Sequence, residues 1–287
     1  MSISTTYGNI MPIGHTEAAV TAARPRHAPS TRIALDVQNV GLRYQTAKRK
    51  EGPLVLSGAS LEIRHGEFFC LLGPSGCGKT SMLTLMAGFL KPTEGQLTLD
   101  GKVIGKPEAD RGVVFQGEDA LFPWLTALDN VAFGLKMRGM GKAERYAKAE
   151  QFLELVGLRG QGQKYPTEMS GGMKQRVQIA RVLVNDPKIL LMDEPFGAVD
   201  AQTRSRLQDE LVEIWQKTGK TIVFITHDIS ESVLLADRVG VMSKGPGSHI
   251  ASIVGIDMPR PRYRGSPAFG VMWEQINNLI ESQEGQP

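Results

Sequence analysis

Two kinds of hydrophobic pattern alternate along the chain and predict strands and helices in turn. From Ile33, the run IALDVQNVGLRY alternates apolar and polar residues as a half-buried strand does, and a second strand is expected near Leu54 to Leu61. Short apolar runs then recur between helical segments, at FFCLL, GVVF, KILLM, TIVFI and RVGVM. This alternation predicts an α/β fold with a mostly parallel sheet. The early strands, with Asp100-Gly101 as a turn signal, predict an antiparallel β subdomain at its edge.

Three further segments have helical patterns. Thr126 and Asp129 have capping-box spacing, with Asp in place of Glu or Gln, and predict a helix through Met137. Another helix is expected across GKAERYAKAEQFLELVG, with an apolar side formed by Ala147, Phe152, Leu153, Leu155 and Val156. Ser266-Pro267 predicts the start of an amphipathic C-terminal helix. We expect it to pack back on the domain rather than on a partner, through Phe269, Met272, Trp273, Ile276, Leu279 and Ile280.

Composition excludes several classes of protein. A chain of 287 residues with 41% hydrophobic content predicts one main domain with an appended lobe. The net charge of +3, from 33 basic and 30 acidic residues without a long basic block, argues against a nucleic-acid partner. Cys70 and Cys77 form no disulfide framework, which favours a reducing cytoplasm. No apolar run approaches the roughly 18 residues of a membrane span.

The segment GPSGCGKT, from Gly73 to Thr80, predicts a phosphate site. It follows a strand and precedes an apolar helix, which is the context that the G-x-x-x-x-G-K-[ST] loop requires. Gly76 and Gly78 let backbone N–H groups approach phosphate oxygens, Lys79 reaches the β and γ phosphates, and the Thr80 hydroxyl ligates Mg²⁺. The alternative is a glycine-rich turn without a ligand. Cys77 occupies a free position of the loop and is interpreted as filler rather than as a redox switch.

A second motif, KILLMDEP, indicates what happens to the phosphate. Asp193 ends a buried strand, where an open α/β sheet binds its ligand, and can hold Mg²⁺ through water. Glu194 can accept a proton from an attacking water. The alternative for both acids is a favourable charge at a helix N-terminus before Pro195. Paired acids downstream of a phosphate loop favour hydrolysis over phosphoryl transfer to a small molecule.

The third motif, MSGGMKQRVQIARVL, suggests a second phosphate cradle. Ser170, Gly171 and Gly172 open a helix that is expected to run to about Val184, and a capped helix start binds anions. One compact chain cannot grip a single nucleotide with two cradles. The segment resembles the signature of the ATP-binding-cassette (ABC) family, with Met169 for the usual Leu and Met173 for the usual Gln. In that family two domains dimerise head to tail, which implies that this signature acts on the nucleotide of a second copy.

The resemblance implies further site residues. Tyr44 corresponds to the aromatic residue that stacks on adenine, with an edge-strand core residue as the alternative. Gln116 corresponds to the glutamine that touches Mg²⁺ and the attacking water. Asp200, in GAVD, corresponds to the loop that senses the opposite site, and His227 to the histidine that contacts the γ-phosphate. The nucleotide-binding loop would be formed by Gly73, Pro74, Ser75, Gly76, Cys77, Gly78, Lys79, Thr80 and Ser81.

The stretch FQGEDALFPWLTALDNVAFGL narrows the resemblance to importers of nitrate, sulfonates, taurine and bicarbonate. It implies an ATP- and Mg²⁺-dependent ATPase that powers uptake of a small anion through a separate permease. The expected partners are a second cassette, in a homodimer, and indirectly a periplasmic binding protein. The expected place is the cytoplasmic face of the inner membrane. The alternative is a soluble ABC-family ATPase with a non-transport partner, whereas the signature helix excludes a P-loop kinase.

The resemblance also divides the chain. Residues 1–31 are expected to form a flexible tail, residues 32–257 the ATPase domain with a helical lobe at about 117–183, and residues 258–287 a basic loop and the amphipathic helix. Phe122 and Trp124 lie between Gln116 and the lobe. They would belong either to the core of the lobe or to a groove for a coupling helix of the permease.

Overall fold

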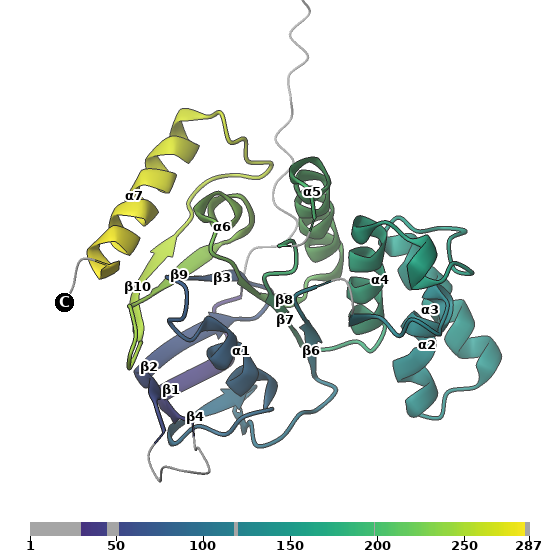
Figure 1. The fold of residues 1–287 in the computed structure, drawn as a ribbon, viewed down its shortest axis with the longest axis horizontal. Helices are drawn as coiled ribbons and strands as arrows, with labels where there is room; N and C mark the ends of the chain where they lie inside the picture. The colour runs from purple at the N-terminus through teal and green to yellow at the C-terminus, as the bar shows by residue number, and fades with distance from the viewer. Residues whose placement is uncertain (1–29, 45–51, 118–119, 198, 285–287) are drawn as a thin grey trace, which may run out of the picture.

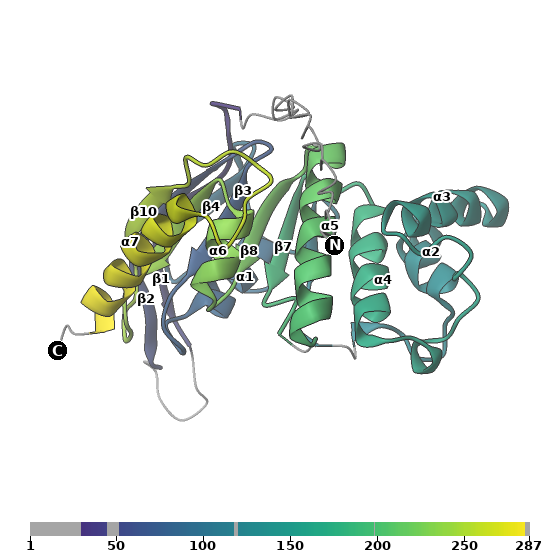
Figure 2. The same ribbon diagram turned by 90° about the horizontal axis from the view of Figure 1, so that it is seen from above.

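The computed structural model describes residues 30–44, 52–117, 120–197 and 199–284. A central sheet with helices on both faces is flanked by a four-stranded antiparallel sheet, and a helical lobe projects beyond the far edge of the central sheet (Figures 1 and 2). This arrangement confirms the predicted α/β fold with an antiparallel β part and an α-helical part. Most of the expected N-terminal tail lies outside the described residues.

The central sheet has the strand order β10-β9-β3-β8-β7-β6. Its strands are parallel except β10, which pairs antiparallel with β9 and was not predicted. The parallel strands are apolar runs because both faces of the sheet are covered: Phe68 and Cys70 of β3 face one hydrophobic cluster, and Phe69 faces the other. The strands are β3 (Phe68–Leu72), β6 (Arg111–Val114), β7 (Ile189–Asp193), β8 (Thr221–Ile225), β9 (Arg238–Met242) and β10 (Ile250–Gly255).

The antiparallel sheet has the order β2-β1-β4-β5 and, with helix α1 (Lys79–Ala87), shares a hydrophobic cluster with one face of the central sheet. Its strands are β1 (Ile33–Arg43), β2 (Leu54–Arg64), β4 (Glu94–Leu99) and β5 (Lys102–Val103). Asp100 and Gly101 form the turn between β4 and β5 with φ values of 51° and 76°. Left-handed backbone at both positions is what a two-residue hairpin turn needs.

The helical lobe contains α2 (Ala127–Met137), α3 (Lys142–Leu155), the 3₁₀ turn η2 (Pro166–Glu168) and α4 (Gly171–Leu183). Helix α2 begins as predicted, because the Thr126 hydroxyl accepts a hydrogen bond from the backbone N–H of Asp129 (3.1 Å). The Asp129 carboxylate instead accepts hydrogen bonds from the hydroxyls of Thr126 (3.0 Å) and Tyr146 (2.6 Å). The Asp129 side chain therefore does not complete a capping box but links α2 to α3 through its hydrogen bond with Tyr146.

The predicted apolar side of α3 is wrong at Ala147, which is exposed. The buried residues are Ala149, Leu153 and, just after the helix, Val156. They follow one another at spacings of four and three, and two residues turn a helix by about 200°, so Ala147 lies on the opposite side from Ala149. Phe152 and Leu155 are partly buried and pack against the same cluster.

The second face of the central sheet is covered by α5 (Ala201–Thr218), α6 (Ile229–Leu235) and α7 (Pro267–Glu284) (Figure 1). Helix α7 begins after Ser266, whose hydroxyl accepts a hydrogen bond from the backbone N–H of Phe269 (3.4 Å). Phe269 and Ile276 are buried, and the other four apolar residues of the predicted stripe pack partly buried against the same core. The prediction that this helix packs back on the domain is confirmed.

Candidate functional site

The loop between β3 and α1 surrounds the side chain of Lys79. The Lys79 ammonium donates to the carbonyl oxygens of Gly73 (2.7 Å) and Pro74 (2.9 Å), which holds it within the loop. Gly78 precedes α1 at a φ of 96°, and a Cβ there would lie 2.9 Å from a side chain of β2. A cation held in a loop at a helix N-terminus is an arrangement that binds phosphate.

Thr80 and Asp193 meet next to this loop. The Thr80 hydroxyl donates to Oδ1 of Asp193 (3.3 Å), which is 8% exposed at the end of β7. Burial raises the pKa of the Asp193 carboxyl, and the hydrogen bond from Thr80 only partly offsets this. Hydroxyl and carboxylate oxygens suit Mg²⁺, which takes few protein ligands and keeps water and phosphate oxygens in its shell. Thr80 and Asp193 supply one hydroxyl and one carboxylate, a small donor set that fits an ion held jointly with phosphate.

Glu194 and His227 come from neighbouring strands and are in contact. Glu194 follows β7, and its backbone N–H donates to the carbonyl of Ile225 at the end of β8 (3.1 Å). Nδ1 of His227 lies 3.0 Å from Oε2 of Glu194. Glu194 has a φ of 41°, a left-handed conformation that is uncommon outside glycine and clusters at functional sites. The His227 side chain is 65% exposed and that of Glu194 is 23% exposed, so the pair is open to solvent mainly on the side of the histidine.

Gln116 approaches the same place from the other side of β7. It follows β6, the parallel neighbour of β7. Its Nε2 atom lies 3.4 Å from where a Cβ of Gly197 would be, and the backbone N–H of Gly197 donates to the carbonyl of Glu194 (3.1 Å). The Gln116 amide therefore faces the turn that follows Glu194.

Tyr44 and Cys77 lie at the edge of the phosphate loop. The Tyr44 hydroxyl is 3.1 Å from Oγ of Ser81, in the first turn of α1, and the residue is 39% exposed. Tyr44 is thus not a core residue of its sheet. The Cys77 thiol is buried, and burial raises its pKa although the charge of Lys79 opposes this. A protonated, buried thiol fits the interpretation of Cys77 as filler.

The remaining predicted residues gather at the N-termini of α4 and α5. The Ser170 hydroxyl caps α4, and the Asp200 carboxylate caps α5 by accepting from two backbone N–H groups, including that of Thr203 (3.0 Å). Hydrogen bonds from Thr203 and its neighbour lower the pKa of Asp200. A Cβ on Gly172 would lie 2.8 Å from the methyl group of Thr203, so the two helix starts pack closely. Figures 1 and 2 show α4 in the lobe, apart from α1. The structure therefore divides the predicted residues into two separate groups.

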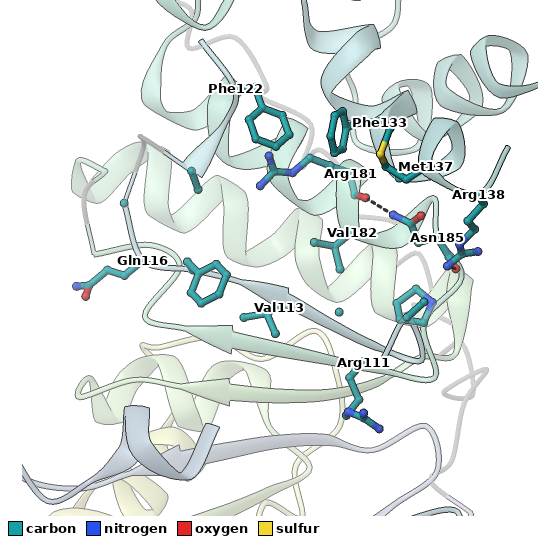
Figure 3. A pocket seen from close by; sticks show the side chains of 17 residues that line it. Arg111, Val113, Gln116, Phe122, Phe133, Met137, Arg138, Arg181, Val182 and Asn185 are labelled. Carbon is teal, nitrogen blue, oxygen red and sulfur yellow. Dashed lines mark hydrogen bonds between the residues drawn. The ribbon is translucent and has the colours of Figure 1, made fainter. Parts of the chain in front are cut away.

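A groove of about 860 Å³ lies between the β6 edge of the central sheet and the lobe (Figure 3). Val113 and Phe115 line it from the side of the sheet, and Phe133 and Met137 of α2 line it from the lobe. Gln116 belongs to the same lining. The groove therefore reaches the group of residues around Glu194.

The rings of Phe122 and Trp124 differ in their surroundings. Phe122 packs on Phe133, with ring centroids 4.7 Å apart, and under the guanidinium of Arg181 (5.3 Å). Trp124 is 70% exposed and touches Phe122 at 5.5 Å between centroids. Phe122 is a wall of the groove, and Trp124 is a surface residue rather than part of the lobe core. The sequence pattern gave no signal for Phe133 or Arg181, because both lie inside helices whose orientation only packing decides.

Comparison with known proteins agrees with these motifs. Residues 56–197 match the family model for the ABC transporter domain. The chain is similar to a taurine import ATP-binding protein of Sinorhizobium fredii (49% identical over 236 residues, 80% of this chain and 88% of the relative). It is also similar to a bicarbonate transport ATP-binding protein of Synechocystis sp. (45% over 262 residues, 89% and 92%). Among solved structures, a dimeric ATP-binding cassette bound to ADP and Pi matches with a TM-score of 0.67 and 31% identity, covering 78% of this chain and 99% of that one.

Proposed function

Because the chain belongs to the ABC transporter family, we propose that it is the ATP-hydrolysing subunit of an importer for a small anion and works with a separate membrane permease. One observation carries the proposal: Glu194 and His227 are in contact beside a complete phosphate loop. The identity to taurine and bicarbonate import subunits extends over most of the chain. Both relatives described above are import or transport subunits, and neither supports the alternative of a non-transport ATPase.

Each residue around the phosphate loop has a chemical task in hydrolysis. Glu194 accepts the proton of the water that attacks the γ-phosphate, and His227, held against it, contacts that phosphate. Lys79 exchanges its two carbonyl partners for phosphate oxygens and stabilises their charge. Tyr44 offers an exposed ring for the adenine next to Ser81.

Thr80 and Asp193 would hold Mg²⁺, with Gln116 reaching the same ion from β6. The ion supplies Lewis-acid neutralisation of charge on the β and γ phosphates when it is bound. Thr80 would contribute a hydroxyl oxygen, and the Asp193 carboxylate would hold the ion through a water molecule. Burial raises the pKa of the Asp193 carboxyl, and a cation bound beside it would lower that pKa again.

Ser170, Gly171 and Gly172 are assigned to the nucleotide of a second copy of this chain. They lie apart from the phosphate loop of the same chain, and their helix start offers free backbone N–H groups to an anion. Asp200 lies next to them and would sense the opposite site. The similar dimeric cassette with ADP and Pi supports such a pairing, and a homodimer suffices because one chain carries both halves.

The groove beside Gln116 is assigned to the permease. Its walls are apolar rings and methionine, its described lining includes Arg111, Arg138 and Arg181 but no carboxylate, and Trp124 stands exposed near Phe122. An apolar groove of this kind suits a short amphipathic helix. Gln116 would then connect the state of the nucleotide to the permease.

The proposal also covers the transported solute, the cellular location of the chain and the limits of its domains. The solute would be a small anion such as nitrate, a sulfonate such as taurine, or bicarbonate, delivered by a periplasmic binding protein. Within the described part of the chain no helix is long and apolar enough to cross a membrane. We assign the chain to the cytoplasmic face of the inner membrane, through the permease, with residues 32–257 as the ATPase domain and 258–287 as the C-terminal extension.

The test is to coexpress the chain with candidate permeases of sulfonate and bicarbonate importers. We expect the chain to copurify from membranes with its permease. We also expect the complex, reconstituted in vesicles, to transport one anion only when ATP and Mg²⁺ are present on the side of the membrane that carries the ATPase subunit. A chain that hydrolyses ATP but associates with none of the permeases would overturn the importer assignment. A chain without ATPase activity in any complex would overturn the enzymatic assignment.

A further inference from the structure

A chain of four hydrogen-bonded side chains connects the C-terminal segment to the residue before His227. Arg264, which lies beyond β10, donates from Nη2 to Oε1 of Gln208 on α5 (2.7 Å). The amide nitrogen of Gln208 donates to Oε1 of Glu231 on α6 (2.8 Å). The other carboxylate oxygen of Glu231 accepts from the hydroxyl of Thr226 (2.5 Å). Three separate segments are thus joined through one buried carboxylate.

Thr226 is placed to control the backbone on both sides of the site. Its neighbour Ile225 accepts the hydrogen bond from the backbone N–H of Glu194 (3.1 Å). Its own hydroxyl oxygen accepts from the backbone N–H of Asp228 (3.0 Å), on the far side of His227. Fixing the Thr226 hydroxyl therefore fixes the turn that presents His227 to Glu194.

The donor and acceptor groups of these four side chains allow only one direction for the hydrogen bonds. An arginine only donates and an ionised carboxylate only accepts, so the Gln208 amide must turn its oxygen to Arg264 and its nitrogen to Glu231. Glu231 then accepts two donors with its two oxygens. Glu231 is 5% exposed and Gln208 is fully buried. A buried carboxylate destabilises the folded state unless hydrogen-bond donors satisfy it, and an apolar side chain that filled the same space would often be as stabilising or more so.

The segment that carries Arg264, at the outer end of the hydrogen-bonded series, is firmly anchored to the domain. Arg260, Arg262 and Arg264 occupy alternate positions and all contact the domain. Arg260 stacks on Trp215 (4.6 Å to the ring centroid) and pairs with Asp237 (2.6 Å). Arg262 is buried and donates to carbonyl oxygens at the end of α6; burial lowers its pKa to about 9, which leaves it charged at neutral pH. The segment that carries Arg264 is therefore held in place independently of Gln208.

We propose that Glu231 is a positioning residue for ATP hydrolysis. It holds Thr226, and through Thr226 it holds His227 against Glu194, while the Arg264–Gln208 pair fixes Glu231 from behind. The proposal rests on the proposed ATPase function. The Glu231 carboxylate is hydrogen-bonded to Thr226 and Gln208, whereas Glu194 and His227 contact each other, so the effect of Glu231 passes through the turn.

The competing explanation is that Glu231 only stabilises the fold. Glutamate in the first turn of a helix is favourable at that position, and a satisfied buried network adds stability. A purely stabilising residue would change the melting temperature but not the turnover of the folded protein. A positioning residue changes kcat and leaves the KM for ATP nearly constant, because the phosphate loop and Tyr44 are untouched.

The first experiment compares Glu231→Gln with the wild-type chain. Glutamine has the same size but only one acceptor oxygen, so it cannot accept hydrogen bonds from both Thr226 and Gln208 as the carboxylate does. We expect kcat to fall about tenfold or more, with the KM for ATP within about twofold, as misplacement of a catalytic group produces. The matched control is Glu67→Gln: Glu67 is 0% exposed and pairs with Arg238 at the opposite end of β3. The control should lower the melting temperature without changing kcat.

A double-mutant cycle with His227→Ala shows whether the effect passes through the histidine. If it does, Glu231→Gln slows the wild type but adds little further loss to His227→Ala, measured as phosphate release under single-turnover conditions. Equal losses in both backgrounds, or a Glu231→Gln protein with full kcat, would overturn the proposal. A wild-type chain that hydrolyses ATP while His227→Ala keeps its full rate would also overturn it, whereas an inactive wild type would overturn the proposed function itself.

Arg264 gives a second test that does not depend on the folding of Glu231→Gln. Arg264 is an exposed residue, so Arg264→Met removes the donor to Gln208 without opening the core. We expect kcat to fall about threefold at constant KM, a loss that corresponds to under 1 kcal/mol, and Arg264→Lys to restore most of it. Unchanged kcat in Arg264→Met would remove Gln208 and Arg264 from the proposal, and unchanged kcat in Thr226→Val as well would overturn it entirely.

Discussion

Nδ1 of His227 lies 3.0 Å from Oε2 of Glu194, although the two residues are separated by a helix and a strand in the chain. The contact arises because β7 and β8 are adjacent and parallel, so their carboxyl ends meet at the same edge of the sheet. The backbone bond from Glu194 to Ile225 fixes their register. A carboxylate and an imidazole ring are therefore held together at this edge of the sheet, where Asp193, the residue before Glu194, meets Thr80.

Glu194→Gln tests the proton acceptor. We expect ATP turnover to fall by about a hundredfold or more, the range in which general bases act, because the amide cannot accept the proton of water. ATP affinity should stay the same, and ATP should hold the protein as a dimer in size-exclusion chromatography. Glu213→Gln, an exposed change on α5, is the control. Normal hydrolysis by Glu194→Gln would show that another group is the base.

Lys79→Ala tests the phosphate loop. Lys79 is the cation inside the loop, so its removal should abolish the rise in melting temperature that ATP and Mg²⁺ produce in the wild type. The protein without nucleotide should remain folded, because only two hydrogen bonds to loop carbonyls are lost. Lys91→Ala, an exposed change just after α1, should keep the full response to ATP. A normal response in Lys79→Ala would place the nucleotide elsewhere.

Gly172→Ala tests the close packing between α4 and α5. The added Cβ would lie 2.8 Å from the Thr203 methyl, so the start of α4 must shift and the signature would no longer match a second copy. Dimerisation with ATP and hydrolysis should both decrease, while ATP binding persists. The double variant Gly172→Ala with Thr203→Ser removes the clashing methyl and should recover part of the activity. Failure of this rescue would indicate that the glycine is needed for contact with the nucleotide itself.

Local motifs made much of this site predictable. The phosphate loop, the acids after KILLM and the start of α4 are each defined by neighbouring residues, and their strand or helix context was readable from hydrophobic runs. Packing decided the rest. The face of α3 was misjudged at Ala147, and β10 was missed because IASIVG becomes a strand only beside β9. The Gln208–Glu231 bond joins residues 23 positions apart, which no periodicity indicates.

The ion pairs of Asp100 predict a dependence of stability on pH. Burial raises the pKa of Asp100, but hydrogen bonds and charges from Lys188 and His65 outweigh this and lower it overall. A carboxyl with a lowered pKa stabilises the folded state above its unfolded pKa of about 3.9 and loses that contribution as pH falls through the folded value. The melting temperature of Asp100→Asn, which keeps a residue that tolerates the left-handed turn, should be below that of wild type at pH 6. The gap should close below about pH 4, and a gap independent of pH would exclude this ion pair as its cause.

Trp124 and Phe122 distinguish a docking surface from a structural core. Trp124 is 70% exposed, so Trp124→Ala should leave the melting temperature and the ATPase rate of the isolated chain unchanged. Phe122 packs on Phe133 and under Arg181, so Phe122→Ala should destabilise the lobe by about 1–3 kcal/mol.

In the complex with the permease, Trp124→Ala should weaken copurification and reduce the stimulation of ATPase activity by binding protein and solute. Val103→Ala, another exposed apolar residue, lies in the antiparallel sheet away from the groove and provides the control. If Trp124→Ala instead lowers the melting temperature as much as Phe122→Ala, the ring of Trp124 stabilises the helical lobe. If it leaves both stability and coupling intact, the permease docks elsewhere and the groove beside Gln116 loses its proposed role.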